Sequence, residues 1–128
     1  MYMIQTGFHK KFLVLSCMAL ALGVIVGAFG AHGLQDKLTI KQLGTYDTAV
    51  KYWFYNSLGL LGLSILGYLK NLGHWPSIVI FIGMLIFCMA LWLNALLAMP
   101  VFGMVAPIGG LTMVVGWIFA GFSINKNL

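Results

Sequence analysis

Four long apolar stretches, none of which contains a charged side chain, dominate the sequence. They run over residues 12–31, 52–69, 77–98 and 104–124. A helix needs about 20 apolar residues to cross the hydrocarbon core of a bilayer, and each stretch is close to that length. Because every backbone amide must find a partner inside lipid, the stretches are predicted to be helices. The pattern therefore predicts an all-α fold in which residues 1–128 form a single domain, an integral membrane bundle of four transmembrane helices.

The first apolar stretch follows Lys10 and Lys11, a pattern that also opens a secretory signal peptide, and Ala28-Phe29-Gly30 resembles a cleavage site. The apolar core of a signal peptide is about 7–15 residues long. This stretch is longer and three more follow it, which favours an uncleaved first span over a signal peptide.

The only sizeable polar segment connects the first two stretches, over residues 33–51. Within and just after it, Leu43, Tyr46, Val50 and Trp53 recur at helical spacing. This predicts an interfacial helical segment that lies at the membrane surface and leads into the second span. A membrane anchor is the simplest role for the segment, and a gating or partner-docking helix is the alternative. The other connections are short, which predicts antiparallel neighbours.

Composition supports a membrane location. Hydrophobic residues make up 62% of the chain and charged residues 7%, against about a quarter for charged residues in a soluble domain. The net charge of +5 comes from lysines that flank the apolar stretches without forming a patch, so lipid headgroups rather than nucleic acid are the expected partners. Asp47 and Lys51, four residues apart, are expected to pair. Four lysines on the side of the termini against three on the other favour cytoplasmic termini.

Small residues recur every four positions along the first span, and such a stripe lets another helix approach closely. We expect the first helix to be central to the bundle and to pack tightly on a partner, with a homo-oligomer interface as the alternative. The last span offers a matching row. The two rows are Ala19, Gly23, Gly27 and Ala31, and Thr112, Gly116 and Ala120.

Glycines bracket a histidine where the first span ends, in Gly27-Ala28-Phe29-Gly30-Ala31-His32-Gly33-Leu34. An imidazole can exchange a proton or bind a metal, but His9 and His74 are predicted on the opposite membrane face. We therefore expect no metal or haem site. His32 is predicted to cap the first helix, with Gly33 ending it; a proton-sensitive or lipid-headgroup contact is the alternative.

Few other residues in the spans carry polar chemistry. Asn94 is predicted to be the deepest strong hydrogen-bonding side chain and to face the bundle interior, followed by Asn56. Helix packing is their simplest role, and a small hydrophilic pathway is the alternative.

The last span opens with Pro107, Gly109 and Gly110, where close packing is favoured over a broken transporter helix. Cys17 and Cys88, both within apolar stretches, indicate no disulfide scaffold.

The block at residues 27–34 resembles the signature of a family of small membrane proteins of unknown function that includes the eukaryotic transmembrane protein 256. Residues 48–52, residues 106–110 and Gly116-Trp117 resemble further blocks of the family. The resemblance implies a four-helix integral membrane protein, with no reaction, ligand or catalytic residue to transfer. Asn56 stands where family members often carry histidine, so a mechanism that pairs two histidines is not implied.

The sequence contains no nucleophile–base pair, phosphate loop or dinucleotide fingerprint. It predicts a non-enzymatic, multi-pass protein of the cell membrane, without cofactor or metal, that supports membrane organisation or stability by packing with lipid, with further copies of itself or with a membrane-protein partner. A small oligomeric transporter or channel for an ion or small solute is the alternative. The candidate functional or packing residues are His32, Gly27, Gly30, Gly33, Asn56, Asn94, Pro107, Gly109 and Gly110.

Overall fold

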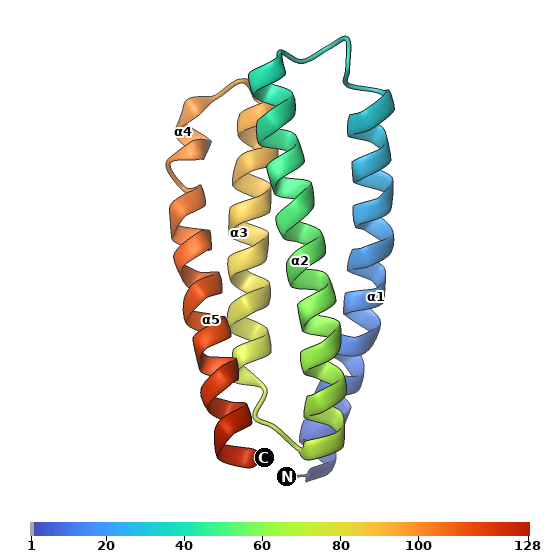
Figure 1. The fold of residues 1–128 in the computed structure, drawn as a ribbon, viewed down its shortest axis with the longest axis vertical. Helices are drawn as coiled ribbons and strands as arrows, with labels where there is room; N and C mark the ends of the chain where they lie inside the picture. Colours follow the sequence, from blue (N-terminus) through green and yellow to red (C-terminus); the bar gives the residue numbers. More distant parts are fainter. Residues whose placement is uncertain (1) are drawn as a thin grey trace.

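The computed structural model describes the backbone of residues 2–128 and the side chains of residues 6–128. Four long helices and one single-turn helix follow one another: α1 (Tyr2–His32), α2 (Ile40–Lys70), α3 (Trp75–Leu97), α4 (Pro100–Gly103) and α5 (Ala106–Asn127). The long helices lie side by side, alternate in direction and leave both chain ends at the same end of the molecule (Figure 1). No strand occurs in the described part, so the prediction of an all-α fold is confirmed.

Three of the helical segments are long and apolar enough to cross a membrane: Thr6–His32, Trp75–Leu97 and Pro100–Asn127. Helix α2 is as long as α1, but its inner face carries buried polar side chains, among them Asn56, Ser57 and Ser64. Three membrane-capable helices are therefore established by length and composition, and α2 is the least apolar of the four long helices.

Local sequence signals set the helix ends. Thr39 caps α2: its hydroxyl accepts from the Gln42 backbone at 3.1 Å, and the Gln42 side chain accepts from the Thr39 backbone at 2.8 Å. This is a capping box, which satisfies two amides that the helix leaves free. Asn71 ends α2 with a left-handed φ of 55°. Pro76 and Pro107 lie in the first turns of α3 and α5, where a missing amide hydrogen costs no helical bond.

From Ile40 onward the polar segment before the second span is helical and leads into that span, as predicted. It forms the first turns of α2, which continues without a break to Lys70. Tyr46 and Val50 are buried within the molecule, so their periodicity reflects contact with neighbouring helices. The position of this segment at the membrane surface stays a prediction.

Helices α2 and α3 occupy the middle of the fold, between α1 on one side and α5 on the other (Figure 1). The apolar segment of α1 is the least buried of the three membrane-capable segments. The prediction that the first helix is central is therefore wrong. Its tight packing on one partner is observed, and that partner is α2.

Aromatic side chains of α2 hold α1 in place. The Tyr46 hydroxyl donates to the Val26 carbonyl at 2.6 Å, and Trp53 Nε1 donates to the Ala19 carbonyl at 2.6 Å. Gly23 of the small-residue stripe and the neighbouring Gly30 make room for these rings: a Cβ at Gly23 would lie 2.9 Å from the Trp53 ring, and one at Gly30 would collide with the Tyr46 ring. The stripe therefore accommodates aromatic side chains rather than a second small-residue row.

Helices α3 and α5 pack backbone against backbone. A Cβ at Gly83 would lie 2.6 Å from the Met113 amide nitrogen, and a Cβ at Gly109 would collide with the Phe87 backbone. Gly116 lies equally close to Ile80. The small row of α5 therefore faces α3. The Thr112 hydroxyl donates to the Ile108 carbonyl of its own helix at 2.7 Å.

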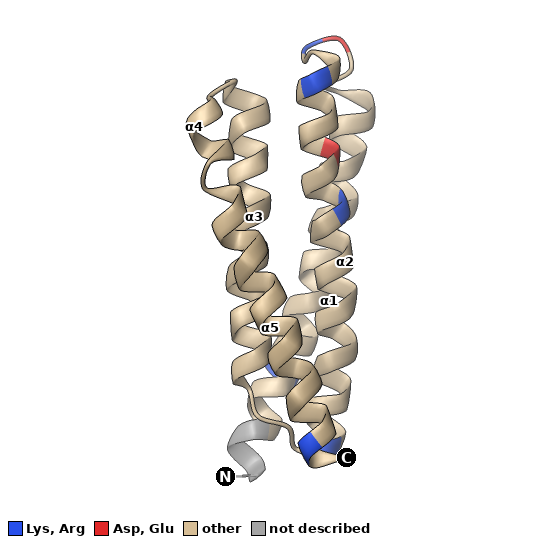
Figure 2. Cartoon of the chain, turned by 60° about the vertical axis from the view of Figure 1, so that its left-hand side comes forward, with Lys and Arg blue, Asp and Glu red and all other residues tan. Residues whose placement is uncertain are grey.

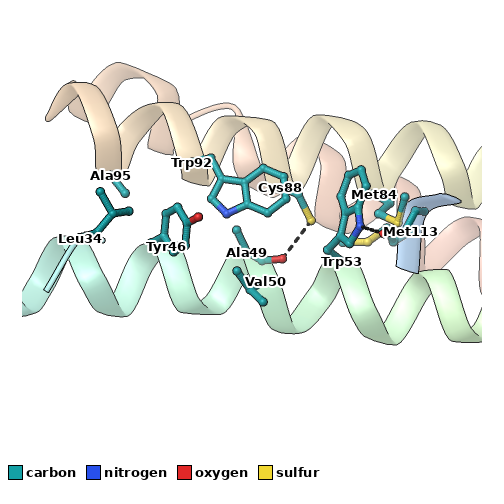
Figure 3. Packing of buried hydrophobic residues seen from close by; sticks show 11 residues of the cluster. Leu34, Tyr46, Ala49, Val50, Trp53, Met84, Cys88, Trp92, Ala95 and Met113 are labelled. Atoms are coloured by element: carbon teal, nitrogen blue, oxygen red, sulfur yellow. Dashed lines mark hydrogen bonds between the residues drawn. The ribbon is translucent and has the colours of Figure 1, made fainter. Parts of the chain in front are cut away.

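Large side chains fill the space between α2 and α3, as Figure 3 shows. Trp92 of α3 lies with its ring centroid 5.3 Å from that of Trp53 and 6.3 Å from that of Tyr46. The Cys88 thiol donates to the Ala49 carbonyl at 3.3 Å. Cys88 is thus a buried free thiol that connects the two central helices.

Charged residues lie near the two ends of the helices and, at Asp47 and Lys51, within the first half of α2, and they leave an uncharged middle (Figure 2). Asp47 and Lys51 form the predicted i,i+4 ion pair, with 3.2 Å between Oδ2 and Nζ. At the same end of the molecule as this pair lies the connection that contains Asp36 and Lys37. Such a distribution is typical of helices whose ends lie in the two headgroup regions.

Candidate functional site

Two concave sites contain four of the predicted candidate residues, Gly27 and Gly30 in the first and Asn56 and Gly110 in the second. The first is a pocket of about 460 Å³ between the end of α1 and the start of α2, here named the α1–α2 pocket. Gly27, Gly30 and Ala31 of α1 line one side, and Gly44 and Asp47 of α2 line the other. The glycine-rich block therefore lines a concavity beside the helix end, in which Gly30 lies directly against the Tyr46 ring.

His32 does not cap α1. Its side chain is exposed and makes no hydrogen bond among the described residues. The end of the helix is instead bonded by Gly33, whose amide donates to the Phe29 carbonyl at 2.7 Å, and by Gln35, whose Nε2 donates to the Gly30 carbonyl at 3.4 Å. The predicted capping role of His32 is wrong, because the connection after α1 supplies Gln35 in its place.

The second site is a groove of about 610 Å³ between α2 and α5, here named the α2–α5 groove. Its lining is largely apolar and aromatic. Gly110, one of the predicted candidates, leaves space in the wall of the groove. A Cβ at this position would meet no atom closer than the Phe87 ring, at 3.7 Å. The groove is lined chiefly by Tyr52, Tyr55, Asn56, Phe87, Gly110 and Trp117.

Asn56 fixes the wall of this groove. Its Oδ1 accepts from Trp117 Nε1 at 2.9 Å, and its Nδ2 donates to the Tyr52 carbonyl at 2.8 Å. Trp117 lies over Gly59 of α2, where an added Cβ would come within 2.5 Å of its ring. Asn56 is buried, at 4% exposure, so its polar atoms are used inside the protein and join α2 to α5.

The remaining candidates belong to neither site. Asn94 is half-buried near the end of α3, and its Nδ2 lies 3.0 Å from the position that a Cβ of Gly103 would take in α4. Asn56 is more deeply buried, so the prediction that Asn94 is the deepest polar side chain is wrong. Pro107 is exposed in the first turn of α5, and Gly109 lies against the backbone of α3. The structure does not bring His32, Asn94 and Thr112 together.

His9 is a buried polar residue that sequence reasoning did not single out. Its side chain is 1% exposed, and Nε2 donates to the Leu72 carbonyl at 2.8 Å. The ring lies directly on Gly67 of α2, so it joins α1 to the end of α2. The spacing of apolar positions gives no signal for this contact, because His9 precedes the apolar stretch. In the described chain, no group of metal-ligating side chains forms around any histidine.

Long antiparallel helices with an uncharged middle and charged ends define a multi-helix membrane protein. The chain belongs to the family described as "Protein of unknown function (DUF423)", which matches residues 26–110. The matched region begins one residue before the glycine-rich block and ends at Gly110, and thus includes residues of both sites.

Three relatives show the extent of the similarity. The UPF0382 membrane protein of Staphylococcus saprophyticus is 36% identical over 110 residues, covering 85% of this chain and 92% of the relative. That of Staphylococcus haemolyticus is 34% identical over 118 residues, covering 91% and 97%. The UPF0382 membrane protein YwdK of Bacillus subtilis is 32% identical over 122 residues, covering 93% and 99%. No solved structure matches the chain.

Proposed function

We propose that this is a non-enzymatic, multi-pass protein of the cell membrane that supports membrane organisation by holding lipid in the α2–α5 groove. In this proposal all four long helices cross the bilayer and both termini are cytoplasmic. The observation that carries it is the groove itself, a preformed, largely apolar concavity between α2 and α5. The link to transmembrane protein 256 rests on the block at residues 27–34 and stays a prediction.

The size and walls of the groove suit an acyl chain. Its volume of about 610 Å³ falls within the range of about 300–1,000 Å³ typical of small-ligand sites. The Asn56–Trp117 hydrogen bond and the Tyr52–Phe87 ring contact, with centroids 5.0 Å apart, hold its sides. A site whose walls are already held by such contacts loses little conformational entropy when a flexible chain binds.

A small transporter or channel has less support. Conduction of a polar solute needs a continuous polar lining. Asn56 donates and accepts within the protein, Thr112 bonds to its own helix, and His32 is exposed at the end of α1. These residues make separate contacts, which favours packing and lipid binding over a shared pathway.

The groove is tested by filling it. In Gly110→Leu the Cβ of the new side chain lies 3.7 Å from its nearest neighbour, the Phe87 ring. The leucine is therefore expected to occupy the groove without disturbing α3. We expect about tenfold less phospholipid to remain bound through detergent purification, a difference of about 1.4 kcal/mol in affinity. Quantitative lipid analysis of the purified full chain measures it.

Gly121→Leu in the same helix is the matched control. A Cβ at Gly121 meets no atom within 4 Å, and the residue lies outside the α2–α5 groove. We expect this variant to retain as much lipid as the unsubstituted protein. Equal retention by the two leucine variants contradicts the proposal.

A further inference from the structure

The α1–α2 pocket has a different chemistry from the α2–α5 groove. It lies at the end of the molecule where Asp36, Lys37, Lys41, Asp47 and Lys51 gather. If the helices cross the bilayer as proposed above, this end lies at the depth of the lipid headgroups, and the inference rests on that part of the proposed function. The part of a membrane lipid that lies at this depth, and can therefore contact the pocket, is its headgroup.

Hydrogen-bond acceptors dominate the polar part of the pocket. Asp47, which lines it, is one of only two acidic residues in the chain. The carbonyl end of α1 adjoins it, and in the described chain no backbone amide bonds to the carbonyls of Ala31 and His32. The last carbonyls of a helix carry the negative end of its dipole. The pocket thus combines a full and a partial negative charge.

A positive group lies beside these acceptors. Lys51 Nζ is 3.2 Å from Asp47 Oδ2, and the two side chains are 59% and 62% exposed. An ion pair this exposed contributes little to stability, so the two side chains can separate at little cost. Separated, they offer a carboxylate and an ammonium about one helical turn apart, complementary to the two charges of a zwitterionic headgroup.

We propose that the α1–α2 pocket binds a phospholipid that carries a primary ammonium, as in phosphatidylethanolamine. The lipid ammonium donates hydrogen bonds to Asp47 and to the carbonyl end of α1, and the lipid phosphate pairs with Lys51. A primary ammonium has three N–H donors for these acceptors. The quaternary ammonium of phosphatidylcholine has none, so the acceptors select between the two headgroups. Gly44 keeps the entrance open.

The test is a lipid titration of the detergent-solubilised full chain, followed by native mass spectrometry. The lipids are phosphatidylethanolamine, phosphatidylcholine and phosphatidylglycerol with identical acyl chains. We expect phosphatidylethanolamine to bind about tenfold more tightly than phosphatidylcholine, the effect of one charge-assisted hydrogen bond. Phosphatidylglycerol is expected to bind no better than phosphatidylcholine. Equal binding of the first two, or tighter binding of phosphatidylglycerol, overturns the proposal.

Two variants and their matched controls locate the site. Asp47→Asn is expected to remove the preference for phosphatidylethanolamine, whereas Asp36→Asn, the other acid, keeps it. Gly44→Leu fills the pocket from a position where a Cβ meets no atom within 4 Å, and it is expected to remove the preference too. Gly62→Leu, equally open on the same helix, keeps it. A preference that survives Asp47→Asn overturns the proposal.

Two further arms separate the alternatives. Soluble phosphoethanolamine, which has the headgroup without acyl chains, is expected not to compete at the lipid concentration; competition assigns the pocket to a soluble amine and overturns a lipid ligand. Gly110→Leu in the α2–α5 groove is expected to lower binding of all three lipids and to leave their order unchanged. Loss of total binding and loss of headgroup preference therefore report the two proposals separately.

Discussion

Gly109→Ala is expected to lower the free energy of unfolding by about 3 kcal/mol, at the upper end of the usual cost of overpacking. The added Cβ would collide with the Phe87 amide and lie 2.8 Å from the Gly83 carbonyl oxygen. Both neighbours are backbone atoms of α3, so no side chain can rotate away and the helices must move apart. Denaturation by SDS in mixed micelles, followed by circular dichroism, measures the change.

The adjacent residue is the control for this prediction. A Cβ at Gly110 lies 3.7 Å from the Phe87 ring, an ordinary contact distance. Gly110→Ala is therefore expected to leave the free energy of unfolding within about 0.5 kcal/mol of the unsubstituted value. Equal destabilisation by the two alanines contradicts the close approach of α3 and α5.

Gly30→Ala is expected to cost about 2 kcal/mol, because its Cβ would occupy the position of the Tyr46 ring. That ring is held by the hydrogen bond from its hydroxyl to Val26 of α1, so moving it also breaks this bond. The change is measured by the same SDS titration. Gly27→Ala is the control, since its Cβ would lie 3.4 Å from the Val50 side chain, and we expect it to be tolerated.

A second substitution distinguishes a collision from a general intolerance of alanine at Gly30. Tyr46→Leu removes the ring and its hydroxyl and is destabilising by itself. Combined with Gly30→Ala, it is expected to cost less than the sum of the two single changes, since the collision disappears with the ring. Strict additivity of the two changes shows that Gly30 and Tyr46 do not meet.

The helices themselves were predictable from sequence because their signals are local. Uncharged stretches of nearly 20 residues identify the helical cores, and prolines such as Pro76 identify their first turns. The capping box of Thr39 and Gln42 also follows a recognisable spacing, Thr-x-x-Gln. That spacing predicts the start of α2 at Ile40.

The pairing of helices was not predictable, since small residues permit close approach without naming the partner. Gly23 and Gly30 of α1 accept the rings of Trp53 and Tyr46 of α2, which lie far away in sequence. Gly67 of α2 likewise accepts the ring of His9 of α1, a residue far away in sequence. The contact of Asn56 with Trp117 likewise depends on the tertiary arrangement of α2 and α5. The sequence indicates Asn56 as a candidate residue and Trp117 as part of a family block, but it does not pair them.

Lipid in the α2–α5 groove is the central claim, and photo-crosslinking in vesicles tests it most directly. A phospholipid with a diazirine on its acyl chain is incorporated with the full chain, and labelled residues are mapped by mass spectrometry. The exposed apolar face of α1, with Met18 and Ile25 at 63% and 65% exposure, is the internal reference. We expect labelling to concentrate on Tyr55 and Trp117 and to fall in Gly110→Leu. Equal labelling of the α1 face and the groove contradicts the claim.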